Sequence, residues 1–182
     1  MKRLWVLSMA VAALVVVVPA SVWSDPWDNQ INNPQRFRVL ADFGGTAVLD
    51  RETGLVWERA PENAFQMDWG QAQSQCNLKN VGGRRGWRLP AIQELASLVD
   101  PSVPSPGPTL PPGHPFHNVM VTAGPGGASA YWSATLWEAA PPPPIGGAWH
   151  LSFETGVVAN TTPKSQPHWV WCVRTGAGVD VQ

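Results

Sequence analysis

The stretch Gly86–Leu95, which reads Gly-Trp-Arg-Leu-Pro-Ala-Ile-Gln-Glu-Leu, constrains the fold of this chain more than any other. In its motif Trp87-Arg88-Leu89-Pro90, two large apolar residues alternate with a polar one, which predicts a short extended piece with Trp87 and Leu89 in the core. Pro90 suits the first turn of a helix, because an N–H in that turn has no partner within the helix, and its absence from proline therefore costs nothing. The stretch therefore predicts an extended entry into a packed helix.

This second helix has a clear apolar face and a clear end. Four apolar residues recur at helical spacing, which predicts one buried stripe of Ile92, Leu95, Ala96 and Val99. Asp100-Pro101 ends the helix.

An earlier helix is expected over residues 69–78. Asp68 is suited to be its N-cap, and Gln71 stands three residues later, in the spacing of a capping box. Its apolar face places Cys76 inward, together with Trp69 and Ala72.

The rest of the chain alternates strands with loops that are rich in proline and glycine. Apolar runs around short turns that end in glycine predict hairpins over 45–58 and 148–158. Single strands are expected at 131–135 and 168–174. Seven prolines within 101–115 exclude a helix or a central strand there, and two more loops are expected at 122–129 and 139–147.

The N-terminus has the three parts of a secretory signal peptide, which are a basic start, an apolar run from Leu4 to Val18 and small residues after it. We expect cleavage after Ala20, with cleavage after Ser24 or an uncleaved anchor as the alternatives. The expected organisation is a signal peptide at 1–20, a linker at 21–36, one domain at 37–176 and a tail at 177–182. The mature protein is then periplasmic or extracellular and has no membrane span.

Charge and cysteine content narrow the class of protein further. Removal of residues 1–20 leaves 162 residues with 10 basic and 13 acidic side chains, a formal charge of −3 that argues against a nucleic-acid-binding protein. An even number of cysteines in an exported chain suggests a disulfide. With two cysteines, Cys76 and Cys172, only one pairing is possible. The alternative is two free buried thiols.

Six motifs in order resemble the C-terminal domain of the Legionella collagen-like protein, the Lcl C-terminal domain family, over residues 43–175. They include the extended motif at Trp87, and the others are Thr53–Trp57, the Trp-Gly-x-Ala helix with its cysteine, Tyr131-Trp132-Ser133, the Trp149…Phe153…Gly156 hairpin and Cys172-Val173-Arg174. This resemblance implies an α+β, C-type-lectin-like fold, with two helices packed on a twisted, loop-rich antiparallel sheet. It also implies a disulfide between a helix and the last strand, which Cys76 and Cys172 fit.

The family's best-described member is an adhesin that binds sulfated glycans. This chain has no collagen-like repeat and a negative mature charge, and both differences argue against that particular ligand.

Eleven tryptophans accompany a single tyrosine, and indole faces stack well on sugars. We expect six of them in the core, namely Trp57, Trp69, Trp87, Trp132, Trp149 and Trp171. Trp137, beside a proline loop, and Trp169, just after Pro167, are the expected surface contacts. Arg84 and Arg85 are further candidates, because a guanidinium binds carboxylate or sulfate bidentately, whereas Arg88 is expected to pair with an acid of its own domain.

No cofactor or metal is expected. The calcium-binding triplets of lectins with this fold do not occur, and His114, His117, His150 and His168 form no metal motif. Nucleotide-binding and hydrolase fingerprints are also missing, and both cysteines are expected to be structural.

We therefore expect an exported binding module that is not an enzyme. It would recognise a glycan or a cell-surface or envelope partner through the loops at 101–129 and 137–147. The alternative is a structural or protein-interaction subunit of an envelope assembly with no small ligand, and an enzyme is the third hypothesis. The sequence leaves the oligomeric state open.

Overall fold

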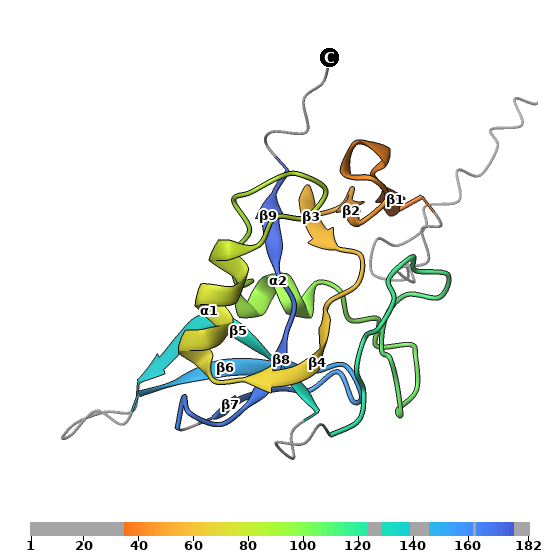
Figure 1. Ribbon diagram of the computed structural model, residues 1–182. Helices are drawn as coiled ribbons and strands as arrows, with labels where there is room; N and C mark the ends of the chain where they lie inside the picture. The colour runs from red at the N-terminus through yellow and green to blue at the C-terminus, as the bar shows by residue number, and fades with distance from the viewer. Residues whose placement is uncertain (1–34, 124–128, 139–145, 162, 177–182) are drawn as a thin grey trace, which may run out of the picture.

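The computed structural model describes residues 35–123, 129–138, 146–161 and 163–176, and it is an α+β structure with two helices and two mostly antiparallel sheets (Figure 1). The expected signal peptide 1–20 and the tail 177–182 lie outside the described residues, as does the linker 21–36 except for its last two residues. Most of the two loops expected at 122–129 and 139–147 lies outside them as well.

The first sheet has four antiparallel strands in the order β1-β2-β3-β9. They are β1 (Phe37–Val39), β2 (Ala47–Asp50), β3 (Leu55–Glu58) and β9 (Val173–Thr175), and a short 3-10 helix, η1 (Ala41–Phe43), joins β1 to β2. The hairpin predicted over 45–58 is confirmed as β2 and β3. Its turn closes through a hydrogen bond from the Gly54 N–H to the Asp50 carbonyl, and Gly54 has the positive φ of 70° that this turn requires.

The second sheet has five strands in the order β4-β8-β5-β6-β7. They are β4 (Glu62–Met67), β8 (His168–Val170), β5 (Ala130–Glu138), β6 (Gly146–Ser152) and β7 (Val158–Thr161). The β6–β7 pair confirms the second predicted hairpin, and β5 confirms the strand predicted at 131–135 while extending it at both ends. All pairs are antiparallel except β5 with β8, which is parallel.

The expectation of one sheet with a continuous last strand at 168–174 is wrong. That segment divides into β8 and β9, which belong to different sheets. The reason is that the backbone of Cys172 pairs with Glu58, since its N–H donates to the Glu58 carboxylate at 2.8 Å and its carbonyl accepts from the Glu58 N–H at 3.2 Å. Trp171 and Cys172 therefore link the two sheets.

The first helix, α1 (Trp69–Leu78), has the predicted boundaries. Its capping box is complete, because the Gln71 N–H donates to Asp68 Oδ1 at 2.8 Å and the Asp68 N–H donates to Gln71 Oε1 at 3.2 Å. Cys76 is fully buried on the inner face, as expected.

The second helix, α2 (Ile92–Ala96), is shorter than predicted. Residue 101 is a proline, so it has no N–H to donate to the carbonyl of Ser97, and the helix cannot continue there. That carbonyl accepts instead from the Arg36 guanidinium at 2.7 Å. The next N–H groups donate to carbonyls only three residues back, from Leu98 to Leu95 and from Val99 to Ala96.

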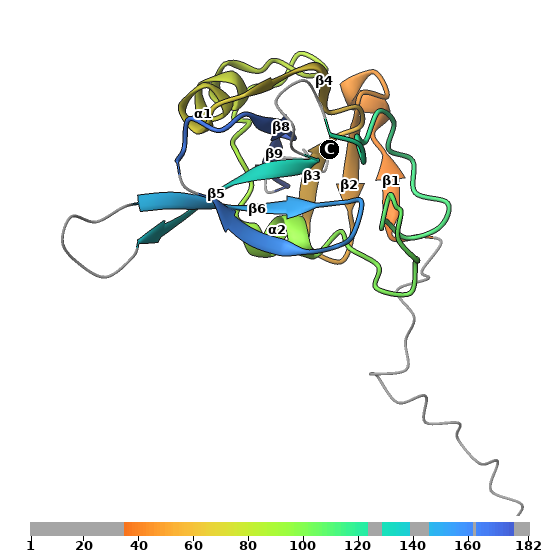
Figure 2. The ribbon, with the colours of Figure 1, turned by 90° about the horizontal axis from the view of Figure 1, so that it is seen from below.

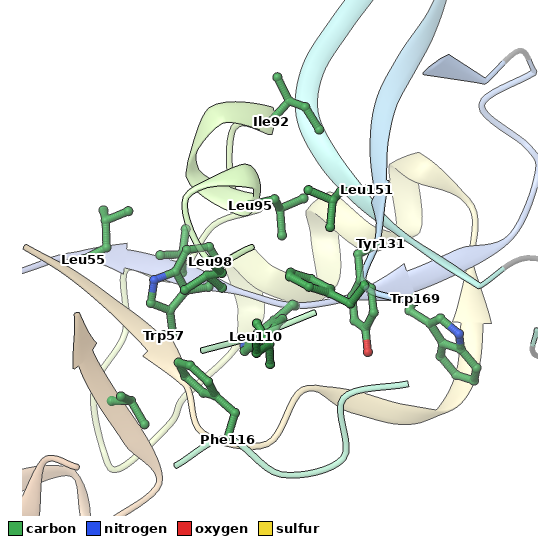
Figure 3. Close-up of a cluster of buried hydrophobic side chains, with 14 residues drawn as sticks. Leu55, Trp57, Ile92, Leu95, Leu98, Leu110, Phe116, Tyr131, Leu151 and Trp169 are labelled. Carbon is green, nitrogen blue, oxygen red and sulfur yellow. The ribbon is translucent and has the colours of Figure 1, made fainter. Parts of the chain in front are cut away.

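The sheets separate two hydrophobic clusters, because successive strand residues point to opposite faces. Tyr131 and Trp169 belong to the cluster with α2, whereas their neighbours Trp132 and Val170 belong to the cluster with α1. Figure 2 shows α1 and α2 on opposite sides of β5 and β6. Figure 3 shows the α2 cluster, in which Leu95 of the helix approaches Leu151 and Tyr131 of the sheet.

Candidate functional site

A pocket with a volume of about 360 Å³ opens where the first sheet meets two loops. We call it the Glu58 pocket, and it is lined by Gly45, Thr46, Glu58, Arg59, Ala60, Val81 and His117. Gly45 and Thr46 precede β2, Glu58 ends β3, and Arg59 and Ala60 follow it. Val81 follows α1, and His117 belongs to the long proline-rich loop. Segments distant in the chain thus converge on one hollow whose size lies near the lower end for small-molecule sites.

Glu58 is the buried acid of this pocket, with its side chain only 4% exposed. Its Oε1 lies 2.8 Å from Lys79 Nζ, and its Oε2 accepts the Cys172 N–H at 2.8 Å. A buried carboxylate is tolerated only when it is paired and hydrogen-bonded in this way. Glu58 therefore connects β3, the end of α1 and the disulfide-bearing segment.

Burial raises the pKa of the Glu58 carboxyl above its usual range. The Lys79 ammonium and the Cys172 N–H oppose this rise, while the Glu62 charge adds to it. His114, close to the pocket residue His117, has its pKa lowered by burial and then by the charge of His117.

Arg59 links the segment before β2 to the proline-rich loop. Its Nε donates to the Pro115 carbonyl at 3.1 Å, and its Nη1 donates to the Gly45 carbonyl at 3.2 Å. Its own carbonyl accepts the His117 N–H at 2.8 Å, so His117 is fixed beside it. Two backbone carbonyls thus set the plane of a guanidinium that lines the pocket.

The prediction that Trp169 lies at the surface is wrong, because this residue is only 2% exposed. It belongs to β8, an inner strand that pairs with β4 on one side and with β5 on the other. Its Nε1 donates to the Thr122 carbonyl at 3.4 Å, so the long loop covers it. Trp169 is therefore part of the core (Figure 3).

Trp137 is half-buried near the outer end of β5, opposite Gly147 of β6. It does not line the Glu58 pocket. Its partial exposure leaves the predicted contact role open.

Arg84 and Arg85 are exposed in the turn that follows α1. The Arg84 guanidinium lies 5.8 Å from the centre of the Phe43 ring, and its carbonyl accepts from Trp87 Nε1 at 2.8 Å. Val81 starts this turn and lines the pocket, but the two arginines do not. None of Trp137, Arg84 and Arg85 therefore lines the Glu58 pocket.

The Trp87-Arg88-Leu89-Pro90 motif forms the predicted core entry, since Trp87 is 2% and Leu89 is 3% exposed. Arg88 pairs with an acid of its own domain, as expected, through two hydrogen bonds of 2.6 and 2.7 Å to the Glu94 carboxylate. Burial alone would raise the pKa of Glu94, but its bonds from Arg88 and from the Ala91 N–H outweigh this and lower it. The motif is a structural corner.

Cys76 and Cys172 form the expected disulfide across 96 residues of sequence. Both cysteines are fully buried, which makes the alternative of free thiols wrong.

Four of the six tryptophans expected in the core are buried there, and Trp69 and Trp149 pack against it partly buried. Within the described ranges, three or more His, Cys, Asp or Glu side chains do not gather in a metal-binding arrangement. No helix in the same ranges is long and apolar enough to cross a bilayer.

The sequence did not identify Glu58 and Arg59 as site residues. One signal was present, because these two charged residues directly follow the apolar run Leu55–Trp57, at the end of a predicted hairpin strand. Convergence with Val81 and His117 depends on tertiary packing and has no local signature.

A family model described as the Lcl C-terminal domain matches residues 46–174. Among proteins with curated descriptions, none matches the chain.

Proposed function

The chain belongs to the Lcl C-terminal domain family, and from this premise we propose that it is an exported binding module for a glycan or for a partner on an envelope or cell surface. The observation that carries the proposal is the Glu58 pocket, in which an apolar wall surrounds a few fixed polar groups. Pockets of this composition are typical of small-ligand sites. His117 belongs to the loop at 101–129 that the sequence suggested as a binding element.

Export to the periplasm or the outside of the cell is part of this proposal. The disulfide between Cys76 and Cys172 supports it, because such bonds persist in oxidising compartments. The signal-like N-terminus supports it independently.

We further propose that the fold is C-type-lectin-like. Two observations support this assignment, namely two helices beside mostly antiparallel sheets and a disulfide that ties α1 to the segment just before the last strand.

The proposal is tested on a glycan array with the exported protein, its disulfide intact, in calcium and in a chelator. We expect binding in both conditions and loss of binding when the pocket is blocked by Ala60→Trp. Ala64→Trp is the matched control, because both alanines are exposed and Ala64 does not line the pocket.

Other outcomes of the array have clear meanings. Loss of binding on Trp137→Ala instead would move the site to the outer end of β5. Binding abolished by the chelator would require a metal site in place of the pocket described here. No binding by a folded sample would favour the structural or protein-interaction role.

A further inference from the structure

The charges around the Glu58 pocket cancel. Arg59 is a cation in its wall and Glu58 an anion, while Lys79 lies 2.8 Å from Glu58 and the Glu62 carboxylate acts electrostatically on the same group. This group of side chains therefore holds two cations and two carboxylates. Unpaired positive charge strengthens the binding of sulfate or carboxylate, and this group of side chains has no net positive charge.

The pocket nevertheless offers fixed hydrogen-bond donors. A guanidinium has five N–H groups, and Arg59 uses one at Gly45 and one at Pro115. Within the described segments the Arg59 guanidinium has no other partner, so three of its N–H groups are available to a ligand. The two carbonyls hold the guanidinium plane in place, which reduces the entropy lost on binding.

The pocket also offers acceptors. Each carboxylate oxygen of Glu58 has two lone pairs and makes, among the described residues, one contact, to Lys79 or to the Cys172 N–H. The exposed imidazole of His117 adds a ring nitrogen at the rim. A ligand hydroxyl, which both donates and accepts, matches such a mixture better than a group that only accepts.

Three of the four remaining lining residues are apolar, and the hydroxyl of the fourth, Thr46, already donates to the Phe43 carbonyl. Ala60 and Val81 present methyl groups, and Gly45 has no side chain. Such walls suit the C–H face of a sugar ring, and the volume of about 360 Å³ fits a terminal residue better than a long chain segment.

We infer that the Glu58 pocket binds an uncharged sugar at the end of a glycan, in preference to a sulfated or carboxylated one. This inference rests on the proposed function and names the ligand class of its site. It differs from the sulfated ligand of the family's best-described member.

The test compares neutral, carboxylated and sulfated glycans on one array and repeats the positive ones by calorimetry at low and high salt. We expect neutral glycans to bind with affinities that change less than about twofold with salt, because screening acts only between charges. His117→Ala should weaken them about 3–10-fold, the effect of one lost hydrogen bond. Ala60→Trp should abolish binding, and Ala64→Trp should not change it.

The outcomes separate this inference from the function on which it rests. Binding only to charged glycans, weakening with salt and lost in Ala60→Trp, would keep the binding function and overturn the neutral ligand class. Neutral binding that is unchanged in both Ala60→Trp and His117→Ala would overturn the pocket as its site. Failure of every glycan class to bind a folded sample would overturn the binding function and this inference together.

Discussion

The backbone N–H of Cys172 donates to Glu58 Oε2 at 2.8 Å, so the segment that carries the disulfide also fixes the buried acid of the pocket. The contact is reciprocal, because the Glu58 N–H donates to the Cys172 carbonyl at 3.2 Å, and Trp171 Nε1 donates to the Glu58 carbonyl at 2.9 Å. The stability of this region and the shape of the Glu58 pocket therefore depend on the same few atoms.

Glu58→Ala should destabilise the protein by about 1–3 kcal/mol, because it leaves the buried Cys172 N–H without an acceptor and Lys79 without its partner. Urea unfolding followed by tryptophan fluorescence measures this loss. Glu62→Ala is the control, since Glu62 is less buried and its side chain, in the part of the chain that the structure describes, accepts only from the nearby Ala64 N–H; it should cost less than about 0.5 kcal/mol. Equal losses in the two variants would contradict the assigned role of Glu58.

Replacement of both cysteines, Cys76→Ala with Cys172→Ala, should cost about 2–5 kcal/mol of unfolding free energy, because the bond closes a long loop in the unfolded chain. Reduction of the wild-type protein should lower its stability by a similar amount, which serves as an independent check. A loss below about 1 kcal/mol in both experiments would show that packing alone holds α1 to the sheets.

Two neighbouring glycines provide a matched pair of substitutions. Gly82 and Gly83 both have positive φ, of 60° and 75°, so alanine is strained at either site. A Cβ on Gly82 would lie 2.5 Å from the Phe43 backbone, whereas a Cβ on Gly83 meets nothing within 4 Å. We expect Gly83→Ala to cost about 1 kcal/mol and Gly82→Ala about 2 kcal/mol more in urea unfolding. Similar costs would mean that the turn moves freely away from Phe43.

Arg88→Lys should cost about 1 kcal/mol, since lysine cannot replace the two parallel bonds from Arg88 to Glu94 and the pair is partly exposed to water. Arg85→Lys, in the exposed turn before it, should change the unfolding free energy by less than about 0.5 kcal/mol. If both variants unfold at the wild-type urea concentration, the pair only orders the corner and does not stabilise it.

Local patterns predicted the elements that depend on neighbours in sequence. The capping box of Asp68 and Gln71 located the start of α1, and the turn at Gly54 located the first hairpin. Amphipathic spacing correctly placed Leu95 in the core, but it could not reveal that Arg36, distant in the chain, takes the Ser97 carbonyl.

Tertiary relationships were beyond the same patterns. The run at 168–174 is apolar throughout, so nothing in it indicates that Cys172 leaves one sheet for the other. Pro167 suggested an exposed Trp169, yet the loop that reaches Thr122 covers that ring. The Glu58 pocket was missed for the same reason, because Val81 and His117 meet Arg59 only in the folded chain.

Acid should destabilise the protein through His168, which is 2% exposed and has no hydrogen-bond partner for either ring nitrogen in the described part of the chain. The centre of its ring lies 4.2 Å from the ring centre of Trp132 and 4.7 Å from the ring centre of His150. Burial, and then the charge of His150, lower its pKa to about 3.

A histidine with a lowered folded pKa contributes stability above its unfolded pKa of about 6.5, and this contribution is lost as the pH falls toward the folded value. Between pH 7.5 and pH 4.5 the wild type should therefore lose about 2 kcal/mol more than His168→Phe, which keeps an aromatic ring against Trp132 and cannot take up a proton. Urea unfolding at the two pH values measures the difference. Parallel losses in the two proteins would show that His168 is protonated without cost in the folded state, which its burial between Trp132 and His150 argues against.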